Sequence, residues 1–159
     1  MKKKIFIGSD HAGFETKEYI IKLLEKELGK KIILEDCGTY SNESVDYSDY
    51  AKIVCKKVLN NNKSNNNNYY GILICGSGTG MQIAANKING IRAVFSYDKY
   101  SAIMGRKDNN ANVLTLRARE FPKSKYKKII INFLETKFSN FSRHKRRIEK
   151  LKKIEKENC

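Results

Sequence analysis

A short stretch in the middle of the chain combines a thiol with three glycines. Residues 72–80 read Ile-Leu-Ile-Cys-Gly-Ser-Gly-Thr-Gly, and a helical pattern follows. A buried strand that turns through glycines into a helix presents free backbone N–H groups, which can hold a phosphate or an oxygen that becomes negative during a reaction. Cys75 stands at the start of this turn, so the stretch predicts a nucleophile or a base beside an oxyanion site. The oxyanion loop would comprise Gly76, Gly78 and Gly80.

The same stretch has two competing interpretations. Free cysteines are often small buried hydrophobic residues, so Cys75 could be purely structural. The glycines match neither the P-loop, since no Gly-Lys-Ser/Thr follows, nor the Gly-x-Gly-x-x-Gly of dinucleotide-binding folds. The turn that follows Cys75 directly favours the chemical interpretation over the structural one.

Other groups suited to an anion follow predicted strands or lie on a predicted helix. Asp10 and His11 come directly after the first strand, although Asp10 could serve only as a helix cap. Arg119 comes shortly after the last predicted strand. Arg143 and Arg147 are four residues apart, so their guanidinium groups share one helical face, an arrangement suited to phosphate.

A parallel α/β fold would position these groups. Strands that alternate with helices favour a parallel sheet with helices on both faces. Since ligands bind outside the carboxyl ends of such strands, we expect residues 8–11 and 75–77 to lie at the same edge. We expect strands at 5–7, 32–34, 72–74, 93–95 and 113–116, and helices around 19–24, 51–59, 81–88, 98–107, 122–138 and 142–157.

Length and composition fit a single domain, 1–159, that is soluble and has no membrane span. The N-terminus is too short in apolar residues for a signal peptide, so we expect a cytoplasmic protein with four reduced cysteines. The chain has no C-x-x-C pair and only two histidines, so we expect no zinc site built from Cys and His. The net charge of +15 favours an anionic partner, which could be a phosphorylated metabolite, a nucleic acid or a membrane surface.

Two segments stand apart in composition. Asn60–Asn68 contains seven asparagines and predicts a flexible low-complexity loop without a function of its own. Residues 142–159 are strongly basic, and the helix expected there carries a narrow apolar stripe of Ile148, Leu151 and Ile154. A stripe of this kind suits a helix that packs on another subunit or on the domain body. The alternative is that the segment is a basic helix surrounded by solvent.

Several motifs, taken together and in order, resemble the type B ribose-5-phosphate isomerases, the family that includes galactose- and allose-6-phosphate isomerase relatives. The resemblance runs from the first strand to the C-terminal helix, apart from the Asn-rich segment. It rests on the motifs at residues 8–14, 36–39, 46–47, 74–80, 83–87, 90–93, 109–112 and 143–147.

This resemblance implies a Rossmann-like three-layer fold, a homodimer or dimer of dimers with a composite active site, a phosphorylated sugar substrate and no metal or other cofactor. It implies interconversion of D-ribose 5-phosphate and D-ribulose 5-phosphate, with Cys75 as the base and Ser77 handling protons at the sugar oxygens. The terminal helix would pack on the partner subunit. The resemblance assigns phosphate contacts to His11, Arg143 and Arg147 and places Arg119 near the same end of the substrate. It assigns the orientation of hydroxyls or ring to Asp10, Tyr47 and Asn109.

One position departs from the family pattern. Asp108 stands where family members usually carry a histidine that helps to open the furanose ring. An aspartate that is ionised near neutral pH accepts a proton from the anomeric hydroxyl but does not readily donate one to the ring oxygen. Ring opening could therefore proceed differently, more slowly or on another sugar, or Asp108 could keep a polar role with little consequence.

The sequence leaves alternatives to this function open. A 6-phosphate aldohexose, allose or galactose 6-phosphate, could be the substrate, and a member inactivated through Asp108 is a further alternative. A basic nucleic-acid-binding module is an alternative of another class, but the aromatic residues are not interleaved with the basic run and no nucleic-acid motif is present.

Overall fold

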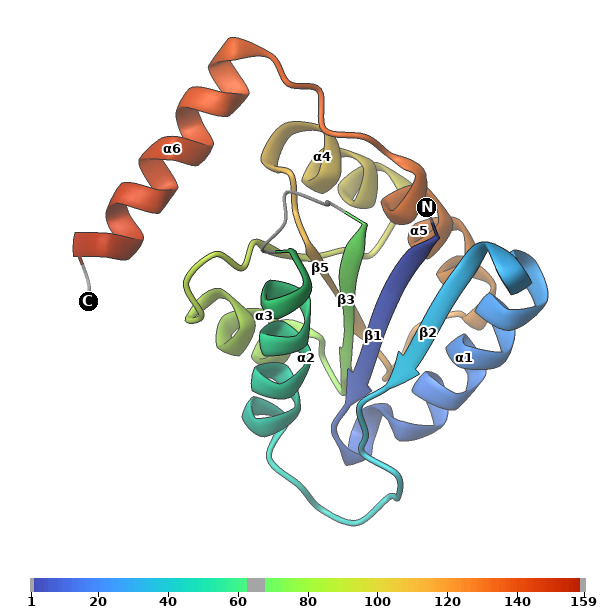
Figure 1. Cartoon of the computed structure of the whole chain (residues 1–159). Coiled ribbons are helices and arrows are strands. Elements are labelled where there is room, and N and C mark those ends of the chain that lie inside the picture. The colour runs from blue at the N-terminus through green and yellow to red at the C-terminus, as the bar shows by residue number, and fades with distance from the viewer. Residues whose placement is uncertain (1, 63–67, 158–159) are drawn as a thin grey trace.

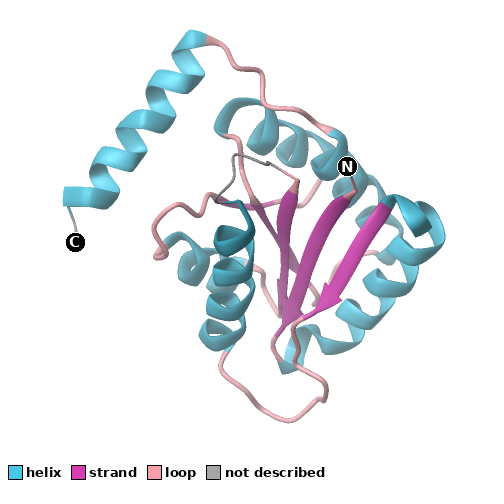
Figure 2. Ribbon diagram, viewed as in Figure 1, coloured by secondary structure: helices cyan, strands magenta, loops and turns pink. Residues whose placement is uncertain are grey.

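Five parallel strands form one sheet between two layers of helices in a computed structural model, which describes residues 2–62 and 68–157 (Figures 1 and 2). The strand order in the sheet is β2-β1-β3-β5-β4, so β1 and β3 lie side by side near its centre. This Rossmann-like α/β fold confirms the predicted class. The strands are β1 (Lys3–Ser9), β2 (Ile32–Asp36), β3 (Tyr69–Cys75), β4 (Ala93–Phe95) and β5 (Val113–Arg117).

Helices connect the strands and cover both faces of the sheet. They are the 3-10 turns η1 (His11–Gly13) and η2 (Gly29–Lys31) and the helices α1 (Phe14–Leu28), α2 (Tyr47–Asn61), α3 (Thr79–Asn86), α4 (Lys99–Asn109), α5 (Lys123–Glu135) and α6 (Ser142–Glu157). Each expected helix is present. In Figure 1, α2 and α3 cover one face, whereas α1, α4 and α5 cover the other.

Alternating side chains of the strands build two separate cores. Ile5 and Ile7 of β1 point to the side of α1, α4 and α5, whereas Phe6 between them points to α2 and α3. The same alternation continues in β3, where Ile72 and Ile74 face one core and Leu73 the other. Successive side chains of a strand point to opposite faces, so a strand buried on both sides is apolar at every position. This explains the continuous apolar runs of β1 and β3.

The Asn-rich segment begins as helix. Asn60 and Asn61 belong to α2, and the amide of Asn62 donates to the carbonyl oxygen of Tyr69 at 3.2 Å. The predicted loop at Asn60–Asn68 therefore starts later than expected, and its residues 63–67 lie outside the described part of the chain.

The C-terminal helix α6 extends away from the helical layers, as Figure 1 shows. Its first turns contact the domain, where His144 and Ile148 are buried. Further along the predicted apolar stripe, Leu151 and Ile154 remain 44% and 53% exposed. In the part of the chain that the structure describes, no helix combines the length and apolar character that a membrane span needs.

Candidate active site

Cys75 ends β3, and the glycine loop folds back over its sulfur. The thiol is 4% exposed, and the backbone N–H of Gly78 donates to Sγ at 3.1 Å. Gly78 adopts φ +82°, and a Cβ atom there would lie 2.4 Å from a ring carbon of Phe95. Glycine is therefore required at this position both by the left-handed backbone and by the close packing. The result is a cysteine held at the first turn of a helix.

The helix that follows the loop supplies backbone donors. Because α3 begins at Thr79, the N–H groups of its first turn have no acceptor within the helix. Ser77 and Thr79 are exposed at the rim, with their hydroxyl oxygens 2.8 Å apart. The loop thus offers N–H groups and two hydroxyls beside the sulfur, as the glycine pattern predicts. This is the chemistry that a developing negative oxygen requires.

Two predicted residues pack directly against the loop glycines. A Cβ atom at Gly80 would lie 3.1 Å from Cζ of Tyr47, at the start of α2. A Cβ atom at Gly76 would lie 3.2 Å from Cζ of Arg119, whose backbone N–H also donates to the carbonyl oxygen of Gly76 at 3.0 Å. The structure therefore places Tyr47 and Arg119 on the two flanks of the oxyanion loop.

Asp10 lies on the neighbouring strand end. Its carboxylate accepts the N–H of Gly13 at 3.0 Å and so caps η1. Burial raises the pKa of this carboxyl group, against the opposing effects of the Gly13 hydrogen bond and the nearby charges of His11 and Arg119.

His11 is fixed through one of its ring nitrogens. Nδ1 lies 3.2 Å from the backbone nitrogen of Val45 and 3.3 Å from its carbonyl oxygen. In the tautomer that accepts from the Val45 N–H, the proton resides on Nε2, which can then donate to an anion. The predicted grouping of residues 8–11 and 75–77 at one sheet edge is confirmed by the adjacent ends of β1 and β3.

The remaining predicted residues lie at the other edge of the sheet. Asp108 and Asn109 end α4, just before β5 begins, and so lie where the strands start. Arg143 and Arg147 lie on α6, which is tied to the same region because Ser139 donates its backbone N–H to the carbonyl oxygen of Lys107. One chain therefore does not bring these four residues to the Cys75 edge.

His144 is a buried residue beside Asp108 that the sequence analysis left unassigned. It is 3% exposed, and its Nδ1 lies 2.7 Å from the Ser139 hydroxyl and 3.6 Å from a carboxylate oxygen of Asp108. Arg143 Nε donates to the other ring nitrogen at 3.1 Å. Its place inside a strongly basic run hid the burial, because a run of charges is typical of a solvated surface.

The three described cysteines are free thiols, Cys37, Cys55 and Cys75, and Cys159 lies outside the described residues. Among the described residues, no group of three His, Cys, Asp or Glu side chains is arranged to hold a metal ion.

Comparison with known proteins gives a consistent result. The model of the Ribose/Galactose Isomerase family matches residues 5–151. The chain is 40% identical over 153 residues to ribose-5-phosphate isomerase B of Escherichia coli, covering 96% of this chain and 97% of that protein. It is 37% identical to ribose-5-P isomerase B of Listeria innocua, covering 98% and 99%.

Solved structures show the same similarity. Type B ribose 5-phosphate isomerase from Trypanosoma cruzi superimposes with a TM-score of 0.91 at 39% identity, covering 100% of both chains. A ribose 5-phosphate isomerase from Thermotoga maritima gives a TM-score of 0.86 at 46% identity, covering 96% of this chain and 99% of that one.

Proposed function

Because the chain belongs to the ribose/galactose isomerase family, we propose that it interconverts D-ribose 5-phosphate and D-ribulose 5-phosphate. The observation that carries this proposal is the thiol of Cys75 beneath the donor-rich turn that opens α3. Aldose–ketose isomerisation needs a base at carbon, an oxyanion site and a grip on the phosphate. The first two of these are combined at the carboxyl edge of β3.

The residues at this edge fit the proton transfers that aldose–ketose isomerisation requires. The thiolate of Cys75 takes the proton from C2 of the open-chain aldose, and the electrons of that bond form an enediolate. Backbone N–H groups of the Gly76–Gly80 loop stabilise its negative oxygen. The Ser77 hydroxyl moves a proton between the two sugar oxygens, and the proton that Cys75 holds returns to C1 to give the ketose. Asp10 and Tyr47 orient the hydroxyl groups.

The split of the site over two sheet edges supports a composite site in a homodimer or a dimer of dimers. Cys75, His11 and Arg119 would face Asp108 and Asn109 of the partner subunit across the substrate. Arg143 and Arg147 of the partner subunit would then hold the phosphate together with His11. The exposed side chains of Leu151 and Ile154 give α6 an apolar stripe to pack on that partner. An enzyme of this kind would use no cofactor and act in the cytoplasm.

A coupled assay of ketose formation tests this function. We expect turnover of ribose 5-phosphate and none of ribose, because the basic side chains select for phosphate. Allose 6-phosphate and galactose 6-phosphate serve as competing substrates, with the unphosphorylated sugars as controls. Faster turnover of either hexose phosphate than of ribose 5-phosphate would assign the chain to hexose metabolism instead.

A further inference from the structure

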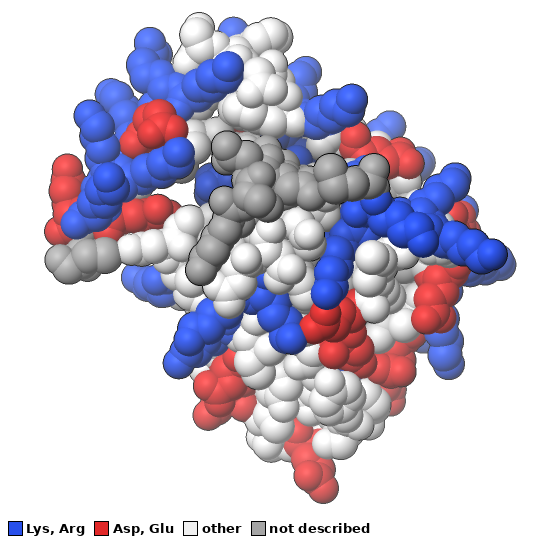
Figure 3. Space-filling view, in the orientation of Figure 1, with Lys and Arg blue, Asp and Glu red and all other residues white. Residues whose placement is uncertain are grey.

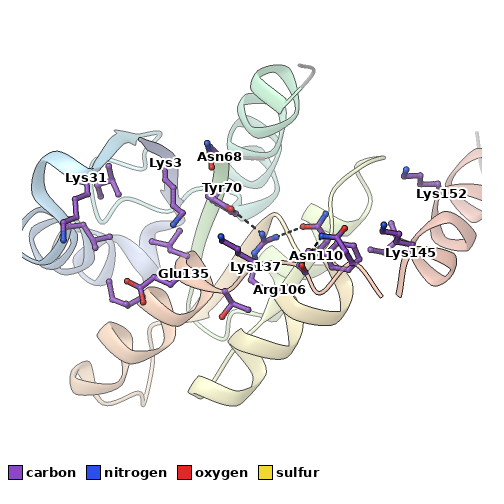
Figure 4. Close-up of a pocket in the computed structure, with 18 of the residues that line it drawn as sticks. Lys3, Lys31, Asn68, Tyr70, Arg106, Asn110, Glu135, Lys137, Lys145 and Lys152 are labelled. Atoms are coloured by element: carbon purple, nitrogen blue, oxygen red, sulfur yellow. Dashed lines mark hydrogen bonds between the residues drawn. The ribbon is translucent and has the colours of Figure 1, made fainter. Parts of the chain in front are cut away.

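A cavity of about 870 Å³ lies at the amino edge of the sheet, remote from Cys75 (Figure 4). Its walls come from the starts of β1 and β2, the ends of α4 and α5, the segment after α5, and α6. Apolar side chains form part of the lining, among them Leu28, Ile32, Leu134, Phe138 and Ile148. A cavity of this size accommodates a small organic ligand.

A buried arginine lies against this cavity, and the described residues provide no acidic partner for it. Arg106 is 4% exposed, and its guanidinium lies over the rings of Tyr70 and Phe133 at 5.0 and 5.8 Å. It donates to the carbonyl oxygen of Ala111, to the side-chain oxygen of Asn110 at 2.9 Å and to the hydroxyl of Tyr70 at 3.4 Å. All of these acceptors are neutral. Its Nε is buried and has no hydrogen-bond partner among the described residues.

The positive charge around Arg106 is only partly balanced. The carbonyl groups at the end of α4 offset a fraction of it. A second guanidinium lies close by, because Arg92 donates to the backbone oxygen of Asn110 at 2.9 Å. Burial lowers the pKa of Arg92, the charge of Glu155 raises it, and the charge of Arg106 lowers it further. Burying a charge without an opposite charge is unfavourable by several kcal/mol. An anion in the cavity would supply the missing charge.

The rim of the cavity adds further positive charge. Five lysines line it, and Figure 4 shows them entering from several elements: Lys3, Lys31, Lys137, Lys145 and Lys152. Two acidic residues, Glu135 and Glu149, also line the cavity, and Glu149 is paired with Lys152 at 2.7 Å. In Figure 3, Lys and Arg side chains gather over α6. The cavity thus combines a basic rim with an apolar wall.

We propose that this cavity is a second anion-binding site, which takes the phosphoryl group of a small organic phosphate. The phosphoryl oxygens accept from the lysines of the rim, among them Lys137 and Lys145, and the buried positive charge of Arg106 attracts the anion through the cavity wall. The organic part lies against Leu134, Phe138 and Ile148. None of the residues at the Cys75 edge lines this cavity, so it is distinct from the thiol and the oxyanion loop.

Calorimetric titration of the full-length protein with phenyl phosphate tests the proposal. We expect binding that weakens about tenfold in the double variant Lys137→Gln/Lys145→Gln, because two charge-assisted contacts are lost. The matched control is Lys150→Gln/Lys153→Gln, which removes the same charge from exposed positions of α6 outside the cavity. Arg119→Gln distinguishes the two sites, because it changes the Cys75 edge and should leave the affinity of the cavity for phenyl phosphate unchanged.

Two further measurements complete the test. Inorganic phosphate should bind at least about threefold more weakly than phenyl phosphate, because it leaves the apolar wall uncovered. The Arg106→Met variant, if it folds, should no longer bind phenyl phosphate. If it does not fold, the two lysine variants alone decide the test. Equal affinity of the two lysine variants, absence of binding at millimolar phenyl phosphate, or loss of all binding in Arg119→Gln would overturn the proposal.

Discussion

The imidazole Nδ1 of His144 lies 3.6 Å from a carboxylate oxygen of Asp108, and this contact joins the start of α6 to the end of α4. Ser139 completes the contact, since its hydroxyl lies 2.7 Å from the same nitrogen. Asp108, which replaces the histidine expected from the family resemblance, is therefore next to an imidazole supplied by another helix. If Asp108 transfers protons during ring opening, the imidazole of His144 is close enough to influence that transfer.

Asp108→His should raise the rate on ribose 5-phosphate by up to about tenfold, because an imidazole both accepts and donates protons near neutral pH. The measurement is kcat on ribose 5-phosphate. Asp108→Asn, which neither accepts nor donates a proton in this way, is the matched control and should be slower than the wild type. An unchanged or lower rate for Asp108→His would show that Asp108, beside His144, performs its own proton transfer.

Cys75→Ala should lower kcat by a factor of about 10² to 10⁴, the range typical of a lost general base, and leave sugar-phosphate binding measurable. Binding is followed as the increase in Tm caused by ribose 5-phosphate. Cys55→Ala is the control, because Cys55 is an equally buried free thiol on α2, away from the glycine loop. Retention of more than a few per cent of kcat in Cys75→Ala would remove this thiol as the base.

The strands and the Cys75 edge were predictable because their signals are local. Continuous apolar runs marked β1 and β3, and the parallel arrangement placed residues 8–11 beside residues 75–77. The burial of Lys17 was not predictable. Lys17 is fully buried, forms an ion pair with Asp36, and lies over the rings of Phe14 and Tyr40, although a lysine in a charged helix is typical of a surface. Such burial depends on partners that are distant in the sequence.

The division of the predicted site between two sheet edges was also hidden in the sequence. The sequence places Arg119 after a strand and Arg143 and Arg147 on one helical face, but it does not show that Arg119 flanks the glycine loop while the other two lie at the opposite edge. All three are basic residues in the last third of the chain. Their separation follows from the direction of α4 and from the segment that leads to α6, which are properties of the whole fold.

Mixing two inactive variants tests the composite site. Cys75→Ala and the double variant Arg143→Ala/Arg147→Ala should each be inactive, but together they should recover about a quarter of the wild-type activity. Random exchange between dimers makes half of them mixed, and a mixed dimer has one site with every residue intact. Activity is measured after unfolding and refolding the mixture. Two separately refolded samples, combined just before the assay, are the control and should stay inactive.

Recovery in this experiment depends on which chain supplies each residue. If Cys75 and the two arginines acted within one chain, each site of a mixed dimer would lack one of them. No activity would then return, and the composite site would be refuted.

Stability should fall in alkaline solution through the buried thiol of Cys55. Burial raises the pKa of Cys55 to about 12, whereas the unfolded chain exposes a thiol with an ordinary pKa of about 9. Between these values the unfolded state has lost a proton that the native state still holds. The native state thus binds more protons, so the free energy of unfolding decreases as pH rises above 9, by at most about 1.4 kcal/mol per pH unit. Below pH 9 this thiol makes no contribution to the pH dependence.

Urea unfolding at pH 8 and at pH 10.5 measures this effect. Cys55→Ala should be less stable than the wild type at pH 8 because packing is lost, and the difference should shrink by about 2 kcal/mol at pH 10.5. Val54→Ala is the matched control, because Val54 is an equally buried neighbour on α2 that cannot titrate. Its stability difference from the wild type should be the same at both pH values. If the Cys55→Ala difference is also constant, the thiol of Cys55 titrates alike in the folded and unfolded chains, and the alkaline loss of stability has another source.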